Sequence, residues 1–369
     1  MNLHIDYHVL QTVPPSNLNR DDTGSPKTAV FGGVRRARVS SQAWKRATRR
    51  DFKLHLDRND LGVRTKRAVE LLAEQITTAN AGITRSDAEA MATATLEKAG
   101  LRVKAKRNAK ESDSAQTEYL VFFSNQQLDR LATLALEAGE KGPDARSAKA
   151  AFDEHHSIDV ALFGRMVAND ADMNVDAACQ VAHAISTHAV ANEFDYYTAV
   201  DDEAPQDETG AGMIGTIEFN SATLYRYATI DVPSLLENLG DPEATARATE
   251  AFTRSFITSM PTGKQNTFAN GTLPDAVVVL IREGRPVNMV GAFEEAIADD
   301  GGHVAASCQA LASYAHEVEA SFGGAPVAAW VVGVGARAAA LAELGEAASL
   351  DSLVEGVGAA IRQSVAEAG

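Results

Sequence analysis

Polar and apolar residues alternate near the start of the chain, and this pattern predicts a strand. Within residues 3–10 the odd-numbered side chains are apolar, whereas the even-numbered ones include His4, Asp6 and His8. Successive side chains of a strand point to opposite faces, so one face of this segment is expected to meet the core and the other to meet water. The pattern therefore predicts a half-buried strand.

A second alternating run, residues 34–39, leads into a predicted helix. Arg36 and Arg38 fall on the same face of this strand, so they can present their charges to one surface. Ser40 or Ser41 suits the N-cap position, because a side-chain oxygen there accepts hydrogen bonds from the first N–H groups of a helix. The strand is therefore predicted to end where the helix begins.

The predicted helix carries its cations on one side. At about 100° per residue, six side chains fall within an arc of about 140°, namely Gln42, Lys45, Arg46, Arg49, Arg50 and Lys53. The other side holds Ala43, Trp44, Ala47 and Thr48. Residues 35–67 contain twelve Lys or Arg against three Asp, a local charge of +9 in a chain of −16, so the remainder carries −25. A cationic face within an acidic protein favours a phosphate-binding surface over the alternative of a merely solvated helix face.

The rest of the chain divides by its hydrophobic periodicity. Turn formers in residues 13–33 predict an exposed loop that carries Arg20 and Lys27. Further helices are predicted over residues 64–80, 85–100, 124–137, 234–260, 303–322 and 349–368. Further strands are predicted over residues 194–200, 213–221, 222–230 and 276–281. This order predicts an α+β core interrupted by a helical insertion.

Residues outside the basic helix give further candidates for a nucleic-acid surface. Tyr196 and Tyr197 are adjacent, so on a strand they face opposite ways, and a ring beside a cationic surface can stack on an unpaired base. Arg165 and Met166 follow Gly164, which frees the backbone there, although a Met is more often a core residue. Lys264 lies in a loop. A second basic cluster, either a nucleic-acid contact or a solvated loop, consists of Arg102, Lys104, Lys106, Arg107 and Lys110.

Few residues suit catalysis, metal binding or nucleotide binding. Asp21 and Asp22 could hold a metal ion, although Asp residues in turns more often cap the backbone. His183 and His188 are five apart, about 140° on a helix, so packing or capping is expected rather than a shared metal. The glycines of residues 331–337 lack the G-x-G-x-x-G spacing and the Walker lysine. No cofactor is expected.

Length and cysteine content set the class of protein. A chain of 369 residues exceeds the usual size of one core, which predicts a main domain with a substantial insertion. Cys179 and Cys308 are far apart and form no C-x-x-C motif, which argues against a disulfide framework or a structural zinc site and fits a reducing compartment. Residues 1–10 lack the unbroken apolar run of a secretory signal. A soluble cytoplasmic protein with no membrane partner is expected.

Six segments occur in the order in which one protein family carries them. They are NLNRDD (17–22), FGGVRRARVSSQAWKRATRR (31–50), DVALFGRM (159–166), AHAISTHAV (182–190), FDYYTAVDD (194–202) and YRYATI (225–230). Together they resemble the CasC family, the RNA-binding backbone subunits of the type I-E CRISPR surveillance complex called Cascade. The resemblance implies a palm similar to an RNA-recognition motif (ferredoxin-like), a large helical finger insertion and a β-hairpin thumb. The implied limits are palm 1–59, fingers 60–181, palm 182–192, thumb 193–223 and palm 224–369.

The resemblance also implies how the chain holds RNA. Several copies would stack head to tail along one CRISPR RNA, and each thumb would kink the guide and displace a base. Guide phosphates would be held by Arg20, Lys27, Ser40, Gln42, Lys45, Arg46 and Arg49. The kinked nucleotide would be flanked by Met166, Tyr196 and Tyr197, where Tyr-Tyr replaces the Trp-Phe of other family members. The predicted RNA-binding set is completed by Arg165, Thr198 and Lys264.

The implied partners follow from that assembly, and two other functions remain as alternatives. The partners are the CRISPR RNA, the target DNA strand paired with it, neighbouring copies, CasA, CasB, CasD and CasE, and indirectly the recruited helicase-nuclease. No catalysis is expected. The main alternative is a metal-dependent ribonuclease of a CRISPR effector complex that uses Asp21 and Asp22, in the part of the chain where relatives in other effector types carry a catalytic acid. The other is a free-standing RNA-binding protein that does not polymerise.

Overall fold

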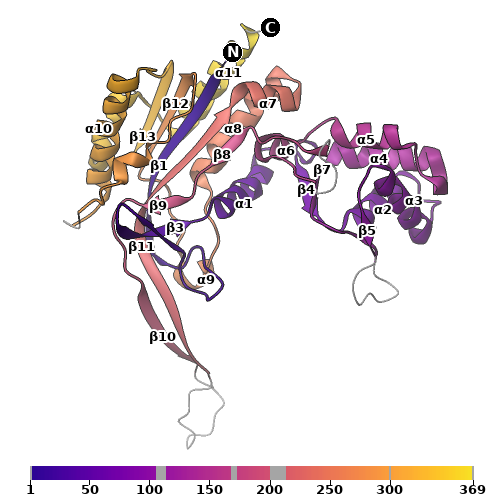
Figure 1. Ribbon diagram of the computed structural model, residues 1–369, viewed down its shortest axis with the longest axis horizontal. Coiled ribbons are helices and arrows are strands. Elements are labelled where there is room, and N and C mark those ends of the chain that lie inside the picture. Colours follow the sequence, from indigo (N-terminus) through magenta and orange to yellow (C-terminus); the bar gives the residue numbers. More distant parts are fainter. Residues whose placement is uncertain (1, 105–113, 168–172, 200–212, 299–300, 368–369) are drawn as a thin grey trace, which may run out of the picture. The chain divides into compact units, whose positions relative to one another are not determined.

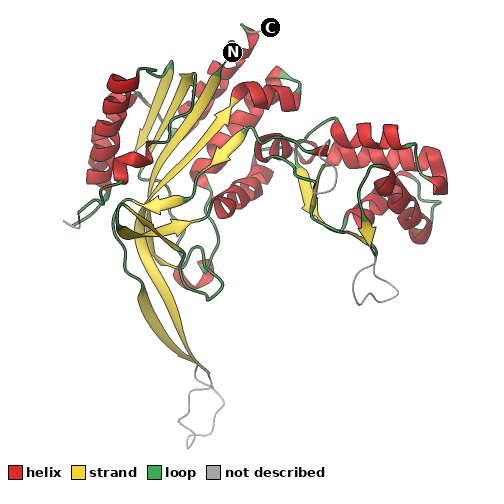
Figure 2. Cartoon of the chain, viewed as in Figure 1, coloured by secondary structure: helices red, strands yellow, loops and turns green. Residues whose placement is uncertain are grey.

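The protein is a two-unit α+β chain, in line with the class predicted from the order of its elements (Figure 2). The computed structural model describes residues 2–104, 114–167, 173–199, 213–298 and 301–367. Unit 1 comprises the described parts of residues 1–51, 180–230 and 252–360, and unit 2 those of residues 52–179, 231–251 and 361–369. The boundary between the units falls inside α8 (Pro242–Thr258) and α11 (Leu350–Ala366).

Unit 1 is built on a ten-stranded sheet (Figure 1). Its strands run in the order β14-β13-β12-β1-β11-β9-β3-β2, and β8 and β10 pair with β11 outside this path. The strands are β1 (Leu3–Ser16), β2 (Thr28–Phe31), β3 (Val34–Val39), β8 (Cys179–Val181), β9 (Ala184–Ser186), β10 (Glu193–Ala199), β11 (Met213–Asp231), β12 (Ala276–Glu283), β13 (Ala328–Gly333) and β14 (Glu346–Ala347). The helical segments of unit 1 outside α8 and α11 are α1 (Ser41–Asp51), α9 (Gln265–Phe268), η5 (Met289–Phe293), α10 (Val304–Phe322) and η6 (Ala336–Leu344).

Both faces of β1 are buried, which corrects the prediction of a half-buried strand. On one face the Tyr7 ring packs edge-on against Phe252 and Phe256. The polar side chains face α10 and η5, where Asp6 accepts a 2.7 Å hydrogen bond from the Tyr227 hydroxyl. Burial raises the pKa of Asp6, because desolvation disfavours its charged form. Distant segments cover both faces of the strand, and they supply hydrogen-bond partners to Asp6 and to Nδ1 of His8.

The two strands predicted over residues 213–221 and 222–230 are one strand, β11. Its first half pairs with β10 in an antiparallel hairpin, and its second half pairs with β9 inside the sheet. In Figure 1 the β10–β11 hairpin extends beyond the other strands of the sheet. The predicted tip of this hairpin, residues 200–212, lies outside the described residues. A continuous β11 therefore connects the hairpin rigidly to the centre of unit 1.

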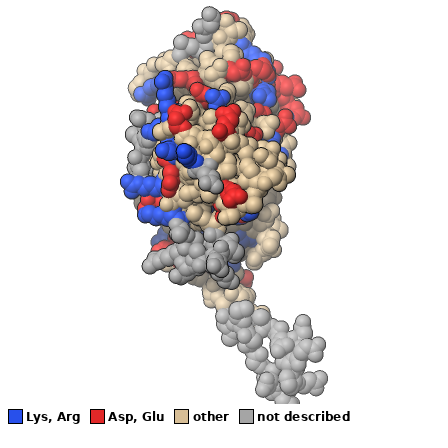
Figure 3. All heavy atoms as spheres, turned by 90° about the vertical axis from the view of Figure 1, so that its right-hand side faces the viewer, with Lys and Arg blue, Asp and Glu red and all other residues tan. Residues whose placement is uncertain are grey.

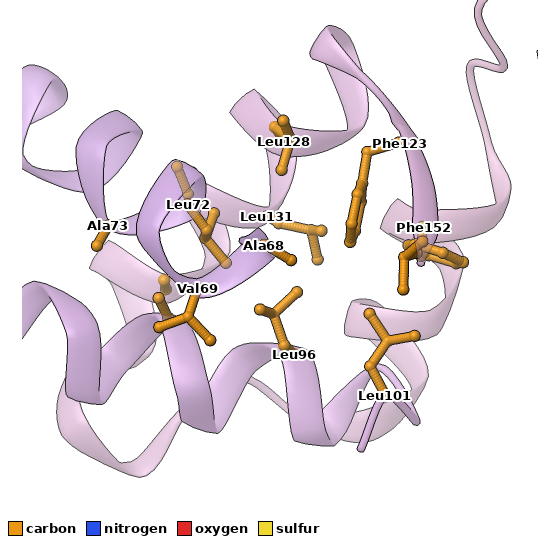
Figure 4. Packing of buried hydrophobic residues seen from close by; sticks show 14 of the residues in the cluster. Ala68, Val69, Leu72, Ala73, Leu96, Leu101, Phe123, Leu128, Leu131 and Phe152 are labelled. Atoms are coloured by element: carbon orange, nitrogen blue, oxygen red, sulfur yellow. The ribbon is translucent and has the colours of Figure 1, made fainter. Parts of the chain in front are cut away.

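Unit 2 is mainly helical and has a core of its own (Figure 4). Its helical segments are η1 (Phe52–Leu54), η2 (Arg58–Asp60), α2 (Ala68–Ala79), α3 (Arg85–Lys98), α4 (Asn125–Ala138), η3 (Gly139–Lys141), α5 (Ala145–Asp153), α6 (Ile158–Phe163) and α7 (Val232–Leu239). Two short antiparallel pairs join β4 (Gly62–Thr65) to β7 (Val121–Ser124) and β5 (Val103–Lys104) to β6 (Gln116–Thr117). Leu72, Leu96, Phe123 and Leu131 pack together in this core, with Phe152 edge-on to Phe123.

Two of the predicted helices have other limits in the structure. The predicted helix 64–80 begins only at Ala68, because residues 62–65 form β4 and pair with β7. The predicted helix 234–260 is divided at Gly240, whose φ of +67° ends α7. Among the described residues, no helix has both the length and the apolar character needed to cross a membrane.

Candidate nucleic-acid interface

The inner side of α1 is fixed by a buried cation. The Trp44 side chain is 1% exposed, and the Arg226 guanidinium lies 3.8 Å from the centre of its ring and 4.7 Å from that of Phe256. Arg226 also donates to Gln11 Oε1 at 2.5 Å and to the Phe256 carbonyl oxygen. Burial lowers the pKa of Arg226 to about 9, so the guanidinium remains charged at neutral pH. This stacking positions α1 on the sheet.

The outer side of α1 carries the cations, as predicted. Gln42 and Arg46 are exposed, and Lys45 and Arg49 are half-buried. The buried side consists of Trp44, Ala47 and Thr48. Within the part of the chain that the structure describes, the side chains of Gln42 and Arg46 make no hydrogen bond or ion pair. The helix carries four cations, Lys45, Arg46, Arg49 and Arg50, against one acid, Asp51, at its end, so it has a net positive charge.

The loop between β1 and β2 is held against the start of α1 by Asn19. Its Oδ1 accepts a 2.9 Å hydrogen bond from the Ser40 N–H, and its carbonyl oxygen accepts one of 2.8 Å from the Lys27 N–H. Ser40 is buried and directly precedes α1, so of the two predicted N-cap residues it is the one in that position. The Arg20 side chain is exposed, and Lys27 is half-buried. The loop therefore carries two cations to the end of the sheet where α1 begins.

Asp21 stabilises a turn in this loop. Its Oδ1 accepts hydrogen bonds from the Thr23 hydroxyl at 2.7 Å, the Thr23 N–H at 2.9 Å and the Ser25 N–H at 3.0 Å. These bonds, first of all the one from the Thr23 hydroxyl, lower the pKa of Asp21. Among the described residues, no group of three His, Cys, Asp or Glu side chains could hold a metal ion. The geometry around Asp21 and Asp22 therefore does not favour a metal-dependent nuclease.

Arg36 is buried, which corrects the prediction that it shares a cationic surface with Arg38. The Arg36 guanidinium donates to the carbonyl oxygens of Phe31 at 3.2 Å, Ser186 at 3.2 Å and Phe293 at 2.9 Å. Burial lowers its pKa. The strand alternates as predicted, but the end of η5 covers the face on which Arg36 lies. Arg38, two residues further along, is half-buried.

Lys264 lies beside the loop that carries Arg20. It precedes α9 and has a left-handed backbone conformation, with φ +50°. The preceding Gly263 packs so closely on the other loop that a Cβ there would lie 2.1 Å from the Leu18 carbonyl oxygen and 3.0 Å from that of Asn17. Only glycine permits this approach. The close contact brings Lys264 to the same end of unit 1 as Arg20.

The β10–β11 hairpin presents two aromatic rings on one face. Phe194 is 67% exposed and Tyr196 64%, and their spacing of two residues puts both on the same side of β10. Thr198 continues this face. Tyr197 is on the other side, where its ring covers Gly215 of β11 so closely that a Cβ there would lie 2.4 Å from the Tyr197 hydroxyl oxygen. The two tyrosines face opposite ways as predicted, and Phe194 is a neighbour of Tyr196 on the same face that was not among the predicted site residues.

Two contacts tie the base of this hairpin to the basic loops. Asn17 donates Nδ2 to the Glu218 carbonyl oxygen at 2.9 Å. The Phe219 ring lies 5.9 Å, centre to centre, from that of Phe268 in α9. Unit 1 therefore joins the basic side of α1, the loops of Arg20 and Lys264, and the base of the hairpin.

Arg165 and Met166 belong to unit 2, and their side chains are placed in different ways. The Arg165 guanidinium lies 4.0 Å from the centre of the Phe152 ring and donates to the carbonyl oxygens of Met173 at 2.8 Å and Phe152 at 3.1 Å. Burial lowers the pKa of Arg165 to about 10. Its guanidinium is buried and bonded to the protein's own carbonyl oxygens, so Arg165 is not part of the proposed interface. Met166 is 80% exposed.

Several exposed cations of unit 2 are paired with acids. Arg67 pairs with Glu70, and Arg85 donates to Glu89 at 2.8 Å. In the second basic cluster, Lys104 donates to Glu118 at 2.6 Å and Arg102 is also near this acid, whereas Lys106, Arg107 and Lys110 lie outside the described residues. Figure 3 shows a face on which acidic and basic side chains both occur, with several cations along its left side. Paired charges of this kind attract a polyanion weakly.

The comparisons with known proteins place this fold in one class, that of CRISPR-associated backbone subunits. A chain of a structure described as "CRISPR RNA-guided surveillance complex, pre-nicking" is 34% identical, with a TM-score of 0.86 over 97% of this chain and 100% of that one. A chain of another, described as "CRISPR RNA-guided surveillance complex", is 29% identical, with a TM-score of 0.74 over 96% of this chain and 99% of that one. No curated protein matches.

The chain belongs to the family of CT1975-like proteins, whose family model matches residues 5–356. The match covers both units and the whole of the candidate interface. The resemblance to CasC-type backbone subunits that the sequence suggested is confirmed by this match and by the two structures.

Proposed function

We propose that this chain is a non-catalytic backbone subunit that polymerises along CRISPR RNA in a type I-E Cascade complex. The observation that carries the proposal is the cationic outer side of α1, which lies next to two basic loops in a chain of net charge −16. The likeness to chains of RNA-guided surveillance complexes supports it. The phosphate-binding residues are Arg20, Lys27, Ser40, Gln42, Lys45, Arg46, Arg49 and Lys264.

These residue types suit a protein that binds a guide RNA without recognising its sequence. Lys, Arg, Gln and Ser contact phosphate oxygens, which are the same in every sequence, so the grip is independent of the guide. The bases remain available for Watson–Crick pairing with the target DNA strand, and this pairing reads the target sequence.

In this proposal the units take the roles of palm, fingers and thumb. The sheet of unit 1 is the palm, similar to an RNA-recognition motif, and the helices of unit 2 are the fingers. The β10–β11 hairpin is the thumb, and its exposed ring pair, Phe194 and Tyr196, displaces a base from the guide. Tyr197 supports the hairpin over Gly215. Met166 contacts the kinked nucleotide from the fingers.

The proposed partners are those of a Cascade particle in the cytoplasm. They are the CRISPR RNA, the target DNA strand, neighbouring copies of this chain and the subunits CasA, CasB, CasD and CasE, with a helicase-nuclease recruited indirectly. A ribonuclease is the weaker candidate, because the Asp21 carboxylate already accepts three hydrogen bonds from its own turn.

Assembly on RNA tests the proposal. Native mass spectrometry of the protein with a guide-length RNA should give particles with several copies per RNA, and the copy number should increase with RNA length. Complementary RNA added with Mg²⁺ should remain uncut. A single copy on every RNA length, or cleavage that disappears in Asp21→Asn, would contradict the proposal.

The hairpin rings should act on the shape of the guide more than on affinity. Base stacking on an aromatic side chain is worth about 1–3 kcal/mol, and phosphate contacts elsewhere would still hold the RNA. The double variant Phe194→Ala, Tyr196→Ala should therefore bind RNA but lose the regular spacing of reactive nucleotides in a chemical footprint. Tyr196→Phe, which keeps the ring, is the matched control and should retain the spacing. An unchanged spacing in the double variant would show that this face of the hairpin does not displace a base from the guide.

A further inference from the structure

A histidine lies beside the two cations Arg38 and Lys27. His183 lies between β8 and β9 and is exposed. β9 pairs antiparallel with β3, with Ala184 opposite Val39, so His183 follows at the point where β3 ends and α1 begins. The Arg38 Nη1 atom lies 3.2 Å from His183 Nδ1.

Arg38 and Lys27 are held next to each other by the backbone. The Arg38 N–H donates to the Lys27 carbonyl oxygen at 2.9 Å, and Arg38 Nε donates to the Thr28 carbonyl oxygen at 3.2 Å. Both residues also line a cavity of about 20 Å³ between β1, β3 and β11. Within the described residues, neither Arg38 Nη2 nor the Lys27 ammonium has a hydrogen-bond acceptor.

The contact with Arg38 favours a neutral His183 ring. A guanidinium can only donate, so as a hydrogen bond this contact requires Nδ1 of His183 to accept, which corresponds to the tautomer with its proton on Nε2. Partial burial, followed by the charges of Arg38 from β3 and Lys27 from the loop, lowers the pKa of His183. Among the described residues, these two cations are the charged groups that act on the ring, and no carboxylate compensates for them.

His183 and His188 are close in sequence, but they have different environments in the structure. His188 is buried, its Nδ1 lies 2.8 Å from the Ala189 carbonyl oxygen and its Nε2 accepts from the Thr223 N–H at 3.0 Å. Its ring is stacked 3.6 Å from that of His303. His188 is therefore a packing residue, as expected, whereas His183 is an exposed member of a cationic surface.

We propose that His183 binds a guide phosphate together with Arg38 and Lys27, and that it takes up a proton when it does so. This inference rests on the proposed function and adds a residue and a pH dependence to it. A phosphate between the three groups supplies the negative charge that the site lacks, so the imidazolium becomes favourable there. The protonated ring and the Arg38 guanidinium then both donate to phosphate oxygens, instead of bonding to each other.

The proposed proton uptake by His183 determines the direction in which RNA affinity changes with pH. The neutral ring of the RNA-free protein must gain a proton on binding, so affinity rises as pH falls between the pKa of the bound state and that of the free state. Within this window the change approaches about tenfold per pH unit, and outside it the affinity is constant.

Binding of a uridine-rich RNA of guide length, at constant ionic strength from about pH 5.5 to 8, tests the inference. The wild-type protein should bind at least about threefold more tightly at the acidic end than His183→Gln, which does not titrate, and the two should converge at the alkaline end. His316→Gln is the matched control, because His316 is half-exposed on α10 beside Glu343, at 3.6 Å. It should retain the wild-type pH dependence.

Calorimetry in two buffers of different ionisation enthalpy provides a second measurement. Proton uptake on RNA binding should be present in the wild type and His316→Gln and absent in His183→Gln and His183→Asn. If the His183 variants take up the same number of protons as the wild type, the inference is wrong, although salt-dependent RNA binding would leave the proposed function intact. If the wild-type protein does not bind RNA at all, the proposed function itself fails.

Discussion

Replacement of Lys45 and Arg49 by Ala should weaken RNA binding by about 10- to 100-fold, since each lost contact at an exposed surface costs a net of about 0.5–1.5 kcal/mol and about 1.4 kcal/mol corresponds to a factor of ten. Both side chains lie on the outer side of α1, one helical turn apart. The loss should be the same for unrelated RNA sequences, because phosphate contacts carry no base information.

Salt dependence provides the sharper measurement of the same variant. For single-stranded RNA, each phosphate contact contributes about 0.7 to the slope of log K against log salt, so the double variant should lose about 1.4. Arg67→Ala, Arg85→Ala is the matched control, because it removes the same charge from two exposed side chains of unit 2 that lie outside the proposed interface. If the slope is unchanged in the α1 variant, or falls equally in the control, α1 does not provide the phosphate contacts.

The sequence predicted those features of the site that depend on local periodicity. The helical period separates Trp44 from the cations of α1, and the structure buries Trp44 and exposes Arg46 accordingly. The strand period likewise puts Tyr196 and Tyr197 on opposite faces. The same period also pairs Phe194 with Tyr196, so the missed residue could have been found from the spacing in FDYY.

Features that depend on distant segments could not be predicted in this way. Alternation fixes the face on which Arg36 lies, but the carbonyl oxygen of Phe293 that covers it comes from 257 residues further along the chain. Arg165 is adjacent to an exposed methionine in sequence, but its guanidinium is buried against Phe152. The contact of His183 with Arg38 depends on the pairing of β3 with β9, which the local sequence does not reveal. A cationic side chain is therefore available to bind a ligand only where no other part of the chain buries it.

Trp44→Ala should lower the free energy of unfolding of the chain by about 3–5 kcal/mol, the usual cost of removing a large buried aromatic side chain. Here the cavity would open next to Arg226, so the buried guanidinium would also lose the ring that lies 3.8 Å from it. A buried charge without a compensating contact is costly. Urea denaturation followed by circular dichroism measures the loss, and RNA affinity should decrease with it, because α1 is no longer fixed on the sheet.

Trp44→Phe separates the stacking contribution from the volume. A phenyl ring keeps a π face for Arg226 and removes the indole N–H, which has no hydrogen-bond partner among the described residues. This variant should therefore lose less than half of the free energy that Trp44→Ala loses. Arg46→Ala, on the exposed side of the same helix, should change stability by less than about 0.5 kcal/mol. If Trp44→Ala were as stable as Arg46→Ala, the buried Arg226 would not hold α1 in place, and the cationic face would need another support.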